Sequence, residues 1–135
     1  GRVWAVDISP RFVEHLERRA QQEGLSQVQV VRCSEDSVEL PAASVDAALV
    51  CDTYHHFEYP RSTLASLHAA LRPGGRLVVV DFERIPGVSR EWTLDHVRAG
   101  KEVFRSEIEA AGFRFEDELE IPGMEENYLL RFRRP

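Results

Sequence analysis

Apolar and polar positions along the chain follow two different periods, and their order predicts an alternating β/α fold. Four short runs are rich in β-branched or continuous apolar residues, which is typical of strands. They occupy residues 3–7, 27–33, 46–51 and 76–82. Three longer segments repeat apolar positions with a helical period of 3.6 residues. They occupy residues 10–23, 60–71 and 101–111.

The strand candidates differ in their expected environment. The run 46–51 is apolar throughout and bounded by acids, which favours a strand buried on both faces. The run 76–82, RLVVVDF, is the most continuous and is our candidate for the central strand. Residues 85–100 give little pattern beyond one helical turn around Trp92.

The end of the chain changes character. Segments 113–121 and 127–132 both alternate apolar and polar residues, and only residues 122–126 separate them. Parallel strands need a crossover of about a dozen residues or more, so this connection predicts an antiparallel hairpin. The expected fold class is α/β, with one domain over residues 1–135 and a mostly parallel sheet that ends in this hairpin.

The first ten residues, GRVWAVDISP, join a strand, an acid and a helix start. Asp7 follows the apolar run at the point where the strand should end. Ser9 is a favoured helix N-cap, and Pro10 is favoured at the first helical position. Open α/β sheets bind ligands outside the carboxyl ends of their strands, so Asp7 is a candidate to hold a ribose; its alternative role is to cap the helix.

Composition and charge narrow the function classes. A formal net charge of -6 argues against nucleic acid as the main partner, and no apolar run is long enough to span a membrane. We expect the cluster Arg131, Arg133 and Arg134 to protect an edge strand from pairing with other chains. Cys33 and Cys51 lie in apolar runs, which favours buried thiols in a reducing, cytoplasmic setting and gives no metal site.

Several motifs in combination resemble class I S-adenosylmethionine-dependent methyltransferases of the small-molecule type, similar to those of ubiquinone and menaquinone biosynthesis. They are VDISPRFVEHL, SEDSVELPAASVDAAL, DTYHHF, ALRPGGRLVVVDF and EIEAAGF. The resemblance implies a Rossmann-like sheet, S-adenosylmethionine as cofactor and a small-molecule methyl acceptor as partner. It covers nearly the whole chain, from the family's second strand to its seventh.

The resemblance also implies a set of cofactor-binding residues. Asp7 would accept hydrogen bonds from both ribose hydroxyls, and Ile8 would lie against the adenine. Glu35 or Asp36, with Asp36 preferred, would take the adenine amino group. Cys51 and Asp52 stand where the fourth strand of the family opens on the cofactor.

A second set of residues is a candidate for the chemistry and the acceptor. Histidine is poised near neutral pH as a general base, which makes His55 and His56 the catalytic candidates, with packing as the alternative. An apolar pocket for the acceptor, or else the core, would explain the nearby aromatic residues. The substrate candidates are Tyr54, Phe57 and His96, with Trp92 and Asp81 close to the same cleft.

The family's first strand and its glycine-rich loop have no counterpart in this sequence, and the chain has its single methionine at Met124. We therefore expect an N-terminally truncated fold that lacks a central strand between residues 3–7 and 46–51, and weakened cofactor binding. The sheet would rearrange, be completed by another chain, including by self-association, or belong to a longer protein. The rival functions are a nicotinamide-dependent oxidoreductase, since an acid after the second strand also suits that ribose, and a non-catalytic interaction module.

Overall fold

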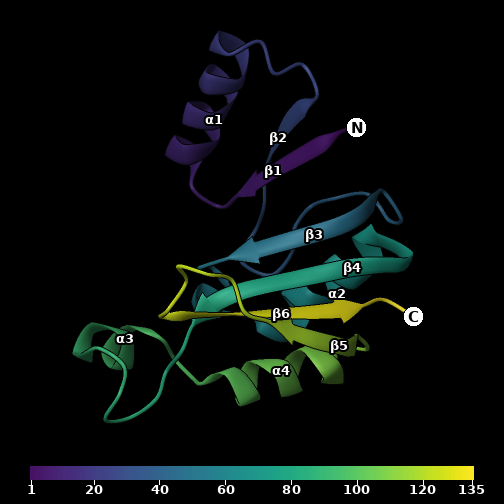
Figure 1. The fold of residues 1–135 in the computed structure, drawn as a ribbon. Helices are drawn as coiled ribbons and strands as arrows, with labels where there is room; N and C mark the ends of the chain where they lie inside the picture. Colours follow the sequence, from purple (N-terminus) through teal and green to yellow (C-terminus); the bar gives the residue numbers. More distant parts are fainter.

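The computed structural model describes residues 1–135 and contains the predicted succession of strands and helices (Figure 1). The strands are β1 (Val3–Asp7), β2 (Val28–Arg32), β3 (Val45–Cys51), β4 (Leu71–Phe82), β5 (Arg114–Leu119) and β6 (Asn127–Arg133). The helices are α1 (Pro10–Gln22), α2 (Pro60–Ala70), α3 (Glu91–His96) and α4 (Lys101–Ala110), with a short 3-10 helix, η1, at Tyr54–His56. The helical turn predicted around Trp92 is α3.

The strands form two sheets rather than one. β1 and β2 make a parallel pair, and the remaining strands are ordered β3-β4-β6-β5. β4 pairs in parallel with β3 and antiparallel with β6, so it is an interior strand, as predicted. β5 and β6 form the predicted antiparallel hairpin. The α/β class, mostly parallel with a C-terminal antiparallel hairpin, is therefore confirmed.

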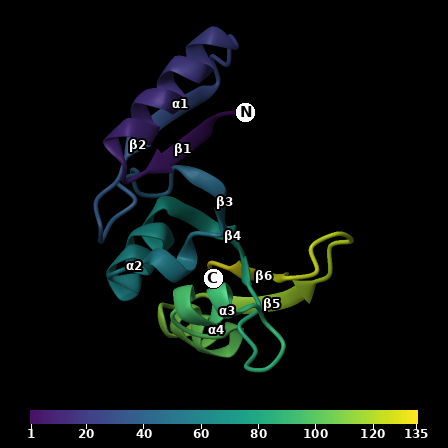
Figure 2. The same cartoon turned by 90° about the vertical axis from the view of Figure 1, so that its left-hand side faces the viewer.

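No strand lies between β1 and β3, which agrees with the gap expected from the sequence. The β1–β2–α1 unit lies apart from the larger sheet in both views (Figures 1 and 2). The prediction that 46–51 is buried on both faces is wrong, because the alternate residues Ala47, Leu49 and Cys51 are exposed, so one face of β3 is not covered. Leu49 is 68% exposed, and Val50 is the only buried residue of β3.

The core lies between the larger sheet, α2 and α4. Its fully buried side chains include Leu64 of α2, Phe104 and Ile108 of α4, and Phe132 of β6. α1 contributes no buried residue, and Phe12 on its predicted apolar face is 61% exposed. A helix that covers only two strands has too little apolar surface beneath it to be buried.

The first part of β4 depends on a glycine. Gly75 has no room for a side chain, because a Cβ there would lie 2.8 Å from the carbonyl oxygen of Arg72 and 3.0 Å from that of Asp46. This close approach brings the start of β4 against β3 and explains the position of Gly75 within the RPGG motif.

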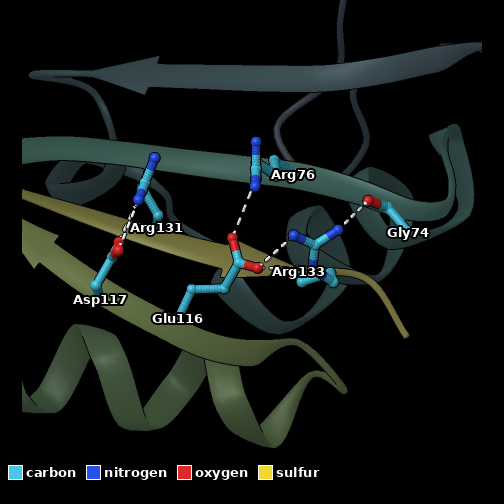
Figure 3. A network of polar contacts seen from close by, with 6 residues as sticks. All are labelled: Gly74, Arg76, Glu116, Asp117, Arg131 and Arg133. Atoms are coloured by element: carbon cyan, nitrogen blue, oxygen red, sulfur yellow. Dashed lines mark hydrogen bonds and ion pairs between the residues drawn. The ribbon is translucent and has the colours of Figure 1, made fainter.

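The C-terminal arginines do not protect an edge strand, because β6 is an interior strand and β5 forms the edge. Arg131 makes a two-pronged contact with Asp117 of β5, at 2.7 and 2.6 Å. Arg133 and Arg76 both contact Glu116, at 2.6 and 3.1 Å (Figure 3). The arginines therefore link three neighbouring strands across one face of the sheet.

Neither cysteine is fully buried, contrary to the prediction. Cys51 is exposed at the open edge of the larger sheet, Cys33 is half-buried, and both are free thiols. No helix combines the length and the apolar character that crossing a membrane would require.

Candidate functional site

A cleft of about 1350 Å³ separates the two sheets, and residues from β1, β3 and the loops after β2 and β3 line it. Its volume exceeds the roughly 300–1,000 Å³ that is typical of a small-molecule pocket. Fifteen of its 27 lining residues are hydrophobic. The predicted site residues that line it are Asp7, Ile8, Glu35, Cys51, His56 and Phe57. The fold therefore brings six residues from four separate segments to one cleft.

Asp7 is held at the end of β1 by the backbone that follows it. The Ser9 N–H donates to Oδ1 of Asp7 at 2.7 Å, and the Cys33 N–H donates to the Asp7 carbonyl at 3.0 Å. Ser9 is the N-cap of α1, with its hydroxyl accepting from the Phe12 N–H at 3.5 Å. Asp7 thus does not cap the helix itself, and its Oδ2 has no hydrogen-bond partner within the chain. A fixed carboxylate with one free oxygen in a cleft can accept hydroxyl groups from a ligand.

The structure separates the two candidate acids that follow β2. Glu35 lines the cleft, whereas Asp36 does not. The Ser34 hydroxyl donates to Asp36 at 2.9 Å and also lies 3.2 Å from Glu39, which keeps Asp36 within its own turn. Geometry therefore favours Glu35, although the sequence led us to prefer Asp36.

Cys51 and Asp52 also differ in position. Cys51 lines the cleft, and burial together with Asp52 and Asp81 raises the pKa of its thiol. Asp52 has a positive φ of 47° and accepts a hydrogen bond from the Asn127 amide at 2.8 Å, outside the cleft lining. Burial, followed by the charge of Asp81, raises the pKa of Asp52.

The two adjacent histidines have different surroundings. His55 is buried, and its Nδ1 lies 2.7 Å from Oδ1 of Asp81, which has no exposed surface. His56 is exposed and lines the cleft. Burial, with the nearby His55 and His96, lowers the pKa of His56, so its ring is favoured in the neutral form. The sequence located Asp81 at the end of its strand, but nothing in the pattern identified His55 as its partner.

The aromatic candidates separate into core and surface residues. Tyr54 has no exposed surface, packs against Phe104 at 4.8 Å between ring centroids and donates to Glu107 at 2.9 Å. Core packing, the alternative left open by the sequence, accounts for Tyr54. Trp92 is 50% exposed and stacks on His96 at 4.7 Å, near the histidine pair but outside the cleft lining.

Comparisons with known proteins identify the family of the chain. A family model described as "Methyltransferase domain" matches residues 1–79. The chain is 34% identical over 93 residues to the S-adenosyl-L-methionine-dependent Diels-Alderase iccD of Talaromyces variabilis, covering 67% of this chain and 32% of that protein. The chain thus spans about a third of the length of this curated relative.

Solved structures share the fold at low sequence identity. A SAM-dependent methyltransferase from Aquifex aeolicus superposes with a TM-score of 0.87 at 20% identity, covering 100% of this chain and 70% of that one. The [4+2]-cyclase SpnF superposes with a TM-score of 0.84 at 17% identity, covering 99% and 66%. By its family match and its fold, the chain belongs to the methyltransferase domain family, of the class I S-adenosylmethionine-dependent type.

Proposed function

We propose that the chain binds the nucleoside part of S-adenosylmethionine and takes part in methyl transfer to a small-molecule acceptor. The observation that carries this proposal is the carboxylate of Asp7, fixed by the Ser9 N–H at 2.7 Å with its second oxygen free in the cleft. Bound S-adenosylmethionine supplies a methyl group on a positively charged sulfur, from which a nucleophile can take it. The chain's own contribution is then to bind, to orient and to exclude water.

The cofactor side of the cleft has groups of the appropriate chemistry. Asp7 would accept hydrogen bonds from ribose hydroxyls, and Ile8, which is 53% exposed beside it, would cover the apolar face of the adenine. Glu35 is the better placed acid for the adenine amino group. Cys51 marks the carboxyl end of β3, where open α/β sheets bind their ligands. We expect weak binding, because the cleft is wider than one such ligand fills.

The acceptor side is proposed to lie around η1. Phe57 lines the cleft and offers an apolar wall, and His56 lies beside it. A neutral imidazole can accept the proton of an oxygen, nitrogen or carbon acid, so His56 and the neighbouring His55 are the proposed bases. Asp81 would act as a positioning residue, since it fixes the ring of His55. His96 lies against both histidines and would contact the acceptor.

Isothermal titration with S-adenosylhomocysteine tests the cofactor part of the proposal. Binding should be measurable for the chain and lost in Asp7→Ala. Asp36→Ala is the matched control, because this acid lies one residue beyond Glu35 but outside the cleft lining, and it should bind as the wild type does. Equal loss in both variants would contradict the assigned role of Asp7. Binding of NADH without any response to S-adenosylhomocysteine would instead favour the oxidoreductase.

The relatives suggest a second product to look for. One relative in sequence is named a Diels-Alderase, and a solved structure that shares the fold of this chain is a [4+2]-cyclase. Acceptor assays should therefore separate a product heavier by one methylene unit from an isomer of unchanged mass. Only the heavier product, formed together with S-adenosylhomocysteine, supports methyl transfer.

A further inference from the structure

Three of the chain's five histidines meet at the carboxyl end of the larger sheet. His55 and His56 belong to η1, which follows β3, and His96 is the last residue of α3. Each offers a ring nitrogen, and these three nitrogens lie within 4.8 Å of one another. The ring centroids are 4.1 to 5.1 Å apart. Loops distant in sequence therefore place three imidazoles in mutual contact.

His55 is oriented by a buried carboxylate. Asp81 accepts from the His55 backbone N–H at 3.1 Å and from the Phe82 N–H at 2.8 Å. Because these contacts use its oxygens as acceptors, we assign a donating N–H to Nδ1 of His55, which lies 2.7 Å from Oδ1. The side chains of His55 and Asp81 are 2% and 0% exposed. The other ring nitrogen, Nε2, is buried without any hydrogen-bond partner. Buried polar atoms are rarely left unpaired, so this lone pair calls for a ligand.

A carboxylate that holds a histidine in this tautomer is the usual outer partner of a metal-bound imidazole. Neutral histidine is the form that ligates a metal. A cluster of three neutral nitrogen donors without a thiolate or an exposed acid is suited to Zn²⁺ and similar divalent transition metals.

We propose that His55, His56 and His96 form a binding site for a divalent transition metal ion of the Zn²⁺ type. Zinc–nitrogen bonds of about 2.0–2.1 Å place tetrahedral ligands about 3.3 Å apart, so the nitrogens must approach one another. His56 and His96 are both exposed, so in this proposal their rings turn toward His55, which Asp81 holds in place. Three protein ligands leave a fourth position for water or for an oxygen or nitrogen of a ligand in the adjoining cleft.

The site does not rest on methyl transfer. Metal ligation and proton acceptance use the same nitrogen lone pairs, so a bound ion and a histidine base exclude each other at a given ring. The metal site and the proposed cofactor site use different residues, so metal binding can be tested without cofactor or acceptor. If no metal binds, the proposed binding of S-adenosylhomocysteine at Asp7 is unaffected.

The test is titration of the tag-free, metal-stripped chain with ZnCl₂ by calorimetry, and with CoCl₂ by absorbance in the visible range. We expect one ion per chain, and quenching of the fluorescence of Trp92 by Co²⁺ because Trp92 stacks on His96. His56→Ala and His96→Ala should each weaken binding by about 10-fold or more. Asp81→Asn should weaken it by about 10- to 100-fold through the orientation of His55.

The matched control is His15→Ala, which removes an exposed histidine of α1 far from the cluster and should bind as the wild type does. Circular dichroism shows whether each variant is folded, and the two exposed cluster histidines can be removed without opening the core. Absence of one-to-one binding in the wild type overturns the proposal. Equal affinity in His56→Ala, His96→Ala and the wild type also overturns it.

Discussion

Removal of the Asp81 carboxylate should be among the most destabilising single changes in the chain. The side chain is wholly buried and accepts three hydrogen bonds, from Nδ1 and the backbone N–H of His55 and from the N–H of Phe82. In Asp81→Ala these donors lose their acceptor without gaining access to water. Each buried donor left unpaired costs about 1–3 kcal/mol. Loss of one partner of a buried pair costs about 3–5 kcal/mol in total, so we expect about 4 kcal/mol.

Asp46 supplies a matched control at the other end of the same pair of strands. It forms an ion pair with Arg72 at 2.6 Å, close to the 2.7 Å between Asp81 and His55, but its side chain is 84% exposed. Water and salt screen such a pair, so Asp46→Ala should cost about 1 kcal/mol or less. The two variants differ mainly in the burial of the carboxylate that is removed.

Urea unfolding followed by far-ultraviolet circular dichroism measures both free energies by linear extrapolation. The comparison is valid when the slope of the unfolding free energy against urea concentration, the m-value, is the same for the wild type and both variants. If Asp81→Ala loses no more free energy of unfolding than Asp46→Ala, the reasoning is refuted that burial of the carboxylate, rather than the length of the contact, determines how much the Asp81–His55 pair stabilises the fold. Asp81→Asn keeps one acceptor oxygen and should fall between Asp81→Ala and the wild type.

Three further changes test other parts of the fold. Burial raises the pKa of Glu107. The hydrogen bonds from Arg98 and Tyr54, together with the charge of Arg98, lower it by a larger total amount, so the pKa lies below its ordinary value of 4.5. Its stabilising effect is therefore complete above that value and is lost as pH falls through the folded pKa, so melting temperatures of wild type and Glu107→Gln should converge in acid. Gly75→Ala should cost about 1–3 kcal/mol in urea unfolding, because the new Cβ would meet the Arg72 carbonyl at 2.8 Å. Leu49→Ala should cost about 0.5 kcal/mol or less by the same measurement, against about 2–5 kcal/mol for a buried leucine, because Leu49 is 68% exposed.

The sequence predicted the elements better than it predicted their burial. Periodicity located the strands and the helices α1, α2 and α4, and the short 122–126 connection identified the hairpin, because these signals are local. Only one turn around Trp92 indicated α3, and η1 was not predicted. The prediction that β3 is buried on both faces was wrong, because an apolar run shows what a strand is able to bury and not which neighbouring elements cover it. The role of Arg131 and Arg133 was wrong for the same reason. Which strand forms the edge is decided by β6 inserting between β4 and β5, and no local pattern encodes that order.

The candidate site shows a similar limit. Strand ends indicated where Asp7, Glu35 and Cys51 would gather: the first two follow the paired strands β1 and β2, and Cys51 ends β3 on the opposite wall of the cleft. The choice between Glu35 and Asp36 depended on the turn after β2, where Ser34 turns toward Asp36. His96 lies 40 residues after His56, within the segment 85–100 that gives little pattern, and only the folded structure brings the three histidines together.

The division into two sheets connects the fold to the proposed chemistry. Asp7, Ile8 and Glu35 lie on the wall formed by the β1–β2 unit and its loops, whereas Cys51 and His56 lie on the wall formed by β3 and η1. No strand pairing joins the two walls, so backbone hydrogen bonds do not fix the width of the cleft. A ligand that touches both walls would restrict their relative position and must supply the ordering free energy from its own contacts. Ligand binding in this cleft should therefore make the two sheets more rigid relative to each other. Asp7 lies on one wall and His56 of the histidine cluster on the other, so the distance between them should become fixed when the ligand binds.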